Sequence, residues 1–143
     1  MSDAAAPDHW TRDPVSRMRV YQLSKDLIRL AWDDCEKLKH HRVTVKTAAQ
    51  LYDAVGSIGA NIAEGYSRSS GRDRVRIYEY ALGSARESMV WYDSSLPVLG
   101  AEIVKDRVTT LEEIRRILLA IIPRERDRLI RPQSPPRRSE APT

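Results

Sequence analysis

Residues 75–96 read VRIYEYALGSARESMVWYDSSL, and the spacing of their apolar side chains decides the fold class. The apolar positions alternate steps of three and four residues through three heptads, a pattern typical of a helix packed in a bundle. Pro97 and Gly100 follow, and they are expected to end this helix or kink its last turn. The pattern predicts a helix over about residues 71–96, with its stripe at Val75, Tyr78, Leu82, Ala85, Met89, Tyr92 and Leu96.

Three other stretches carry apolar stripes with the same period, over about residues 17–40, 44–66 and 102–122. The connections between them are short, which favours antiparallel neighbours. The sequence therefore predicts an all-α protein, an up-and-down antiparallel four-helix bundle. If the second and third helices pair through residues 67–70, their stripes fall at the same levels, with these facing pairs: Ile62 and Val75, Val55 and Leu82, Ala48 and Met89.

A few residues interrupt these stripes. Asp34 is the one polar residue in the stripe of the first helix. Gly56 and Gly59 lie inside the second helix, where each costs about 1 kcal/mol relative to Ala and is tolerable if another helix approaches closely. Pro123 is expected to kink or stop the fourth helix, unless that helix runs on to Leu129.

Composition sets the domain limits and the compartment. Residues 1–16 are polar and are expected to form a flexible N-terminus, and residues 131–143 form a basic, proline-rich tail expected to be disordered. Residues 17–130 remain as the bundle. No stretch has the length and apolarity of a signal peptide or a membrane span, which favours a soluble, cytoplasmic protein. The lone cysteine, Cys35, fits a small core side chain better than a reactive thiol.

The basic residues gather around the predicted turns. Lys and Arg total 24 against 20 Asp and Glu, which gives a net charge of +4. Of these 24 basic residues 19 are Arg, whose guanidinium group can donate two parallel hydrogen bonds to a phosphate. Ordinary solvated charge is the plainer interpretation of such runs. A nucleic-acid interface is the functional one, and its candidates are Arg68, Arg72, Arg74 and Arg76 after the second turn, and Lys37, Lys39, Arg42 and Lys46 around the first. A third group, including Arg124 and Arg126, follows the fourth stripe.

The sequence offers no set of residues that could do chemistry. It contains no GxSxG, HExxH, CxxC or GxxxxGK[ST] motif, and His40 and His41 fit solvated residues at a helix end. We therefore predict no catalytic residue, no metal and no cofactor. A small-molecule enzyme is the least favoured of the possible functions.

Polar residues accompany the small residues of the second and third helices. One interpretation is a structural polar network that ties the two helices together; the other is direct contact with a ligand or RNA. The candidates are Ser57, Asn61, Glu64 and Glu87, with Arg72.

The first helix carries a second apolar stripe, about 100° round its axis from Val20. Tyr21, Ile28 and Trp32 form it. The apolar face is wider than one bundle core needs, so we predict that this stripe and the broad face of the fourth helix form an oligomer interface.

Three segments resemble a known family: RVYQLSKDLIRLAW (19–32), AAQLYDAVGSIGANIAEGYSR (48–68) and YEYALGSARES (78–88). They are similar to the bacterial four-helix bundle proteins named for the 23S ribosomal RNA intervening sequence, and the NIAEG and GSxxE segments are the most specific part. The resemblance implies a homopentameric ring with a basic face toward nucleic acid. Related bundles include the accessory subunit of diversity-generating retroelements, which partners a reverse transcriptase and its RNA. The family's usual Phe-Pro turn before the second helix is missing, and this chain contains no Phe.

Together these observations predict a non-enzymatic, oligomeric bundle that binds RNA or another nucleic acid with little sequence preference. The alternative is a protein-interaction adaptor, such as an accessory subunit of a reverse transcriptase, that uses the same basic face against an acidic protein.

Overall fold

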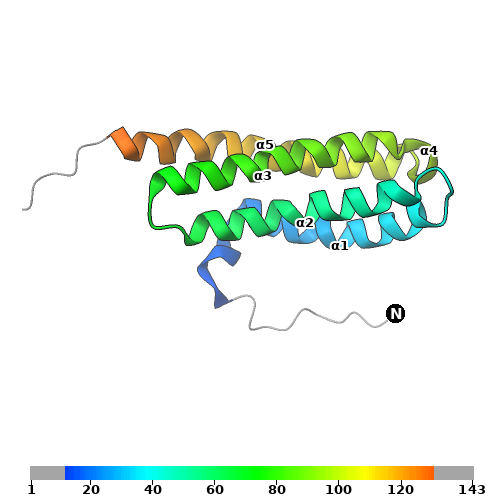
Figure 1. The fold of residues 1–143 in the computed structure, drawn as a ribbon, viewed down its shortest axis with the longest axis horizontal. Helices are drawn as coiled ribbons and strands as arrows, with labels where there is room; N and C mark the ends of the chain where they lie inside the picture. The colour runs from blue at the N-terminus through cyan, green and yellow to red at the C-terminus, as the bar shows by residue number, and fades with distance from the viewer. Residues whose placement is uncertain (1–11, 131–143) are drawn as a thin grey trace, which may run out of the picture.

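The computed structural model describes residues 12–130, and this part of the chain is entirely helical. Four long helices run up and down in chain order (Figure 1), as the apolar stripes predicted. Neighbours pack as α1–α2, α2–α3 and α3–α5, and a smaller α1–α5 contact closes the bundle. The helices are α1 (Arg19–Lys39), α2 (Val45–Ser67), α3 (Gly71–Ser94) and α5 (Ala101–Ile130), with two short pieces, η2 (Pro14–Arg17) and α4 (Leu96–Leu99).

Polar side chains close the two hairpin turns. The Thr44 hydroxyl is buried and donates to the carbonyl oxygen of Leu38 at 2.7 Å, so it satisfies a terminal carbonyl of α1. At the other end of α2, the Ser70 hydroxyl accepts from the Asp73 backbone N–H at 3.2 Å and caps α3. Both turns are therefore fixed by their own hydrogen bonds.

Pro97 and Gly100 precede α5, whereas Pro123 lies inside it. The third helix ends at Ser94, two residues before the predicted end, and Pro97 lies in the first turn of the separate α4. Gly100 has φ +85°, a left-handed conformation that favours glycine, and it joins α4 to α5. Pro123 does not stop the fourth helix, because α5 continues to Ile130. Of the two predicted alternatives, a stop near Pro123 or continuation to about Leu129, the structure agrees with the continuation.

The first described residues are more ordered than predicted. Residues 14–17, mostly assigned from the sequence to a flexible N-terminus, form the 3-10 helix η2, and the Asp13 carboxylate accepts from the Val15 N–H at 3.0 Å. The Val15 side chain is buried beside α1. The prediction for residues 1–16 is therefore wrong for its last part. Residues 1–11 and the predicted disordered tail, 131–143, lie outside the described residues.

The core consists of the predicted stripes. Leu27, Leu51, Ile58, Ile114 and Leu118 are among the fully buried side chains that fill the space between the helices. Filling this interior with apolar side chains is what stabilises the bundle. At the end of the third stripe the prediction fails, because Leu96 belongs to α4 and is 46% exposed.

The register of α2 against α3 also differs from the predicted one. The predicted pairing would put Gly65 level with Arg72, whereas in the structure Gly65 lies against Ile77 and Tyr78. A Cβ atom at Gly65 would come within 2.7 Å of Cε1 of Tyr78. Glycine is therefore required there to seat the tyrosine ring. Gly59 likewise lets α1 approach, since its Cβ would meet Oγ of Ser24 at 2.9 Å.

Asp34, the one polar residue in the stripe of α1, is buried. Its side chain is 1% exposed; Oδ2 accepts from Nε of Arg107 at 2.7 Å and from the Tyr92 hydroxyl at 2.8 Å. The hydrogen bond to Asp34 raises the pKa of Arg107, and burial raises that of Tyr92. The three residues join α1, α3 and α5 through a buried ion pair.

Cys35 is half-buried and packs against the core, as expected for a structural thiol. Burial, aided by the neighbouring Asp34 carboxylate, raises the pKa of Cys35 to about 11. The thiol is therefore protonated at neutral pH, where the reactive thiolate is scarce.

Candidate nucleic-acid interface

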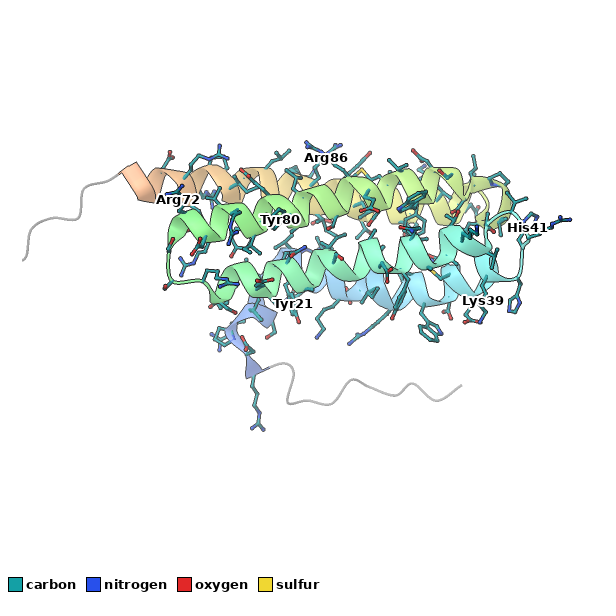
Figure 2. All side chains as sticks on the ribbon, viewed as in Figure 1. Tyr21, Lys39, His41, Arg72, Tyr80 and Arg86 are labelled. Carbon is teal, nitrogen blue, oxygen red and sulfur yellow. The ribbon has the colours of Figure 1, made fainter. Side chains whose placement is uncertain are left out.

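The predicted basic residues lie at opposite ends of the bundle. The α1–α2 turn is at one end and the α2–α3 turn at the other (Figure 1). Figure 2 shows Lys39 and His41 at the first end and Arg72 near the second. Helix α2 has 23 residues, which at 1.5 Å per residue separates the ends by about 33 Å. The structure therefore places the predicted basic groups in two separate cationic regions.

We call the first region the turn cluster: Lys37, Lys39, Arg42 and Lys46. Lys37, Arg42 and Lys46 are exposed, and within residues 12–127 no carboxylate lies in ion-pair distance of any of them. Lys39 differs, because its Nζ pairs with Glu36 at 2.8 Å and lowers the pKa of that carboxyl. Three of the four cations are thus available to an external anion.

The turn cluster is mounted on an ordered turn. The backbone N–H of His41 donates to the carbonyl of Leu38 at 3.2 Å, and that of Thr44 donates to His41 at 3.1 Å. Nδ1 of His41 accepts from the Val43 N–H at 3.2 Å, leaving the rest of the imidazole exposed. The cations therefore project from a turn that is largely fixed before any ligand binds.

The second region, the arginine end, contains the four arginines predicted after the second turn together with Arg124 and Arg126 of α5. Several of its members are paired. Arg68 binds Glu64 at 2.6 Å, and Arg76 lies 3.9 Å from Asp73. Arg74 donates through Nε to the Arg68 carbonyl at 2.6 Å.

Carboxylates from other helices also reach the arginine end. Arg126 of α5 pairs with Glu79 of α3 at 2.6 Å, and Arg74 lies 3.6 Å from Glu125. Arg72 and Arg124 are exposed and pair with no carboxylate in the part of the chain whose side chains are described. The arginine end is therefore more nearly neutral than its sequence indicates.

The predicted polar network is not assembled. Ser57 donates to the Asp53 carbonyl at 2.8 Å, Glu64 pairs with Arg68, and Glu87 accepts from Nε1 of Trp91 at 3.1 Å. Each of these bonds stays within one helix or its end, as is common for polar side chains on helices. Asn61 is partly buried on α2 and joins none of them. These residues do not link α2 to α3.

The second stripe of α1 faces α2 and the surface. Tyr21 and Ile28 are half-buried and line a groove of about 210 Å³ together with Gly56 and Gly59. Trp32 is 57% exposed, and its ring meets the ring of Tyr52 edge-on with centroids 5.8 Å apart. The structure thus places a partly exposed apolar strip along the α1–α2 face.

Residues 12–130 lack two kinds of feature. None of the helices combines the length and apolarity that a membrane crossing requires. No three His, Cys, Asp or Glu side chains converge in a way that could hold a metal ion.

Comparison with known proteins addresses the family. A crystal structure from Bacteroides thetaiotaomicron VPI-5482, described as a protein with unknown function from the S23 ribosomal protein family, has a TM-score of 0.67 at 23% identity; the match covers 72% of this chain and 97% of that one. This likeness shows the shared fold. No curated protein matches the chain. The family model for the 23S rRNA-intervening sequence protein matches residues 16–120. The chain therefore belongs to the 23S rRNA-intervening sequence protein family.

Proposed function

We propose that this protein is a non-enzymatic bundle that binds the phosphates of structured RNA through its turn cluster. The observation that carries the proposal is the set of three exposed cations, Lys37, Arg42 and Lys46, which have no carboxylate partner among the described side chains. A free cation can bind a phosphate without first breaking an internal ion pair. Binding of this kind releases counterions from the RNA and is strongly salt-dependent.

The composition of the turn supports binding with little sequence preference. Residues 40–46 read HHRVTVK and contain no Phe, Tyr or Trp on which an unstacked base could lie. Lysine and arginine side chains on an exposed turn suit backbone phosphates, which carry no sequence information. The free residues Arg72 and Arg124 at the arginine end add a second, weaker phosphate site.

Several copies would strengthen such binding. We propose that the protein forms a homo-oligomer through the α1–α2 face, where Trp32 is 57% exposed and the Tyr52 ring beside it is 37% exposed. Each added copy brings another turn cluster, so the affinity for one long RNA rises through avidity without any new kind of contact. The homopentamer that the family resemblance implies is the expected assembly.

Charge reversal at the turn cluster tests the proposal. We compare Arg42→Glu/Lys46→Glu with Arg86→Glu/Arg116→Glu, in which two exposed, unpaired arginines of α3 and α5 undergo the same charge change. Affinity for a structured RNA is measured from about 50 to about 200 mM salt. Over this range the affinity of the unaltered protein should fall by roughly 10²- to 10³-fold. In the turn variant, the slope of log affinity against log salt concentration should be smaller in magnitude by about two.

The matched variant at Arg86 and Arg116 should keep most of the affinity and the original slope. Equal losses in the two variants, or affinity that ignores salt, would rule out the turn cluster as the interface. Retention of a protein partner after nuclease treatment, with no RNA binding by the purified protein, would favour the adaptor role instead.

A further inference from the structure

A hollow of about 490 Å³ opens at the arginine end, lined by residues of α2, α3 and α5 and by Met18, the residue before α1. Tyr66 of α2, Tyr78 of α3 and Arg124 of α5 are among its lining residues. Its volume falls in the range of pockets that hold small organic ligands. The turn cluster lies about 33 Å away, so the hollow is a separate site.

Tyr78 gives the hollow a fixed hydrogen-bonding group. Its side chain is 3% exposed, and its hydroxyl makes no hydrogen bond within residues 12–127. Gly65 fixes the ring, since no side chain larger than hydrogen fits between α2 and the tyrosine. Because Tyr78 lines the hollow and its hydroxyl is not among the buried side-chain atoms that lack a partner, a ligand in the hollow could accept a hydrogen bond from that hydroxyl.

The other lining groups divide into an anion site, an aromatic platform and an apolar wall. Arg124 is exposed and pairs with no carboxylate among the described side chains, so it is available to an anion. The Tyr66 ring is 41% exposed. Met18 and Ile121 are half-buried and supply apolar surface.

Glu125 and Arg74 lie beside these groups. The Arg74 guanidinium is 28% exposed, and it is held by its hydrogen bond to the Arg68 carbonyl and by Glu125 at 3.6 Å. Burial, with the Glu125 carboxylate as the next cause, raises the pKa of Tyr78, so its hydroxyl is a donor at neutral pH. The hollow therefore offers a cation, a planar ring and a phenol donor within one small volume.

We propose that this hollow binds one unpaired nucleotide of an RNA strand. The phosphate binds at Arg124, the base stacks on Tyr66, and an acceptor on the base edge receives the Tyr78 hydroxyl. The inference rests on the proposed RNA-binding function and gives the arginine end its own role in it. RNA recognition commonly uses a base that leaves its helix and stacks on an aromatic side chain.

The lining chemistry favours a nucleotide over simpler anions. A free phosphate could use Arg124 and the Tyr78 hydroxyl, but it would leave the Tyr66 ring and the apolar wall without contacts. An uncharged apolar ligand would leave the guanidinium groups and the phenol unsatisfied. A nucleotide of an RNA strand combines an anionic phosphodiester with a flat, polar-edged ring, and each of its parts has a counterpart in the hollow.

Titration of the full-length protein with 5′-mononucleotides, ribose 5-phosphate and inorganic phosphate tests the proposal. Tyr78→Phe removes a hydroxyl that has no partner among the described residues, so the variant should fold normally. Tyr80→Phe, on the exposed side of the same helix, is its matched control. Arg124→Gln is compared with Arg116→Gln in the same way.

We expect at least one mononucleotide to bind at least about 10-fold more tightly than inorganic phosphate. Tyr78→Phe should weaken it by roughly 3- to 10-fold, as expected for one hydrogen bond, and Arg124→Gln by about 10-fold or more. Neither control should change it by more than about 2-fold. Equal affinity for nucleotide and phosphate, or equal nucleotide affinity of Tyr78→Phe and Tyr80→Phe, overturns the proposal that the hollow binds a nucleotide.

The same measurements separate this inference from the proposed function. Arg42→Glu/Lys46→Glu should leave mononucleotide affinity unchanged, because those residues lie at the far end of the bundle. If RNA binding keeps its salt slope while no mononucleotide binds, only the pocket is wrong. If mononucleotides bind while structured RNA does not, the phosphate interface at the turn cluster is wrong.

Discussion

Gly65 of α2 and Tyr78 of α3 fit together as a socket and a ring: a Cβ atom on the glycine would lie 2.7 Å from Cε1 and 2.9 Å from Cδ1 of the tyrosine. The glycine belongs to the NIAEG segment, one of those on which the family resemblance rests, and the tyrosine lines the hollow at the arginine end. One glycine thus serves the packing of the hairpin and the shape of the candidate site.

Replacing Gly65 with alanine should destabilise the bundle. Alanine is the better helix former by about 1 kcal/mol, but the clash with Tyr78 should outweigh it and lower the free energy of unfolding by roughly 1–3 kcal/mol. Urea unfolding measures the change. Gly83 is the matched control, because a Cβ there meets nothing within 4 Å, so Gly83→Ala should stabilise the protein. Stabilisation by both substitutions would contradict the close packing of Tyr78 against Gly65.

Removing Arg107 should be costly, because it leaves the Asp34 carboxylate buried without its charge partner. We expect Arg107→Leu to lower the free energy of unfolding by about 3–5 kcal/mol. Tyr92→Phe removes only the hydroxyl and should cost about 1–2 kcal/mol. Chemical denaturation of the two variants and of Asp34→Asn/Arg107→Leu checks this. The double variant should recover part of the loss, and a double variant no more stable than Arg107→Leu would argue against the buried charge as the cause.

The Cys35 thiol should ionise at a higher pH than an ordinary thiol, and it should react slowly at neutral pH. Burial raises its pKa from an ordinary 9.0 to about 11, so in the folded chain the thiol is neutral between these values while in the unfolded chain it ionises. This group's contribution to stability is therefore complete below pH 9 and is lost as the pH rises toward 11. The alkylation rate with iodoacetamide, measured against pH, should have its midpoint near 11, and thiolate reactivity at pH 8 should be about 100-fold below that of a free thiol. A midpoint near 9 would show that the thiol is not buried in solution.

A charge on the α1–α2 face should prevent self-association. Trp32→Glu places a carboxylate in the strip that we propose as the oligomer interface, where removing that charge from water would be costly. Tyr80→Glu introduces the same charge at a side chain of similar exposure on α3. Sedimentation velocity should show smaller particles for Trp32→Glu alone. Assembly lost in both variants, or in neither, would place the interface elsewhere.

The helices and their core were predictable because apolar periodicity is a local property of the chain. The stripe from Val75 to Tyr92 is enough to define α3, and the ends of α1, α2 and α3 fall within two residues of the predicted ones. The register of α2 on α3 was not predictable from the stripes, because it depends on the fit of one ring against one glycine.

The electrostatics of the candidate site were harder to predict, because ion pairs between helices are not visible along the chain. Arg126 meets Glu79, which lies 47 positions earlier in the sequence. The sequence shows these arginines as a group but not the carboxylates that reach them from other helices, and it therefore overestimated the free charge at the arginine end. Asp34 did carry a signal as the single acid in an apolar stripe, but its partner Arg107 lies on α5 and could be found only from the fold.

The separation of the two cationic regions has a geometric consequence for any RNA that binds. They occupy opposite poles of a stiff rod, about 33 Å apart along α2. With a rise of roughly 2.8 Å per base pair in an A-form RNA helix, a straight duplex must exceed about twelve base pairs before it can contact both cationic regions of one molecule. A single bundle would therefore contact a longer stem with both cationic regions and a shorter stem with only one of them.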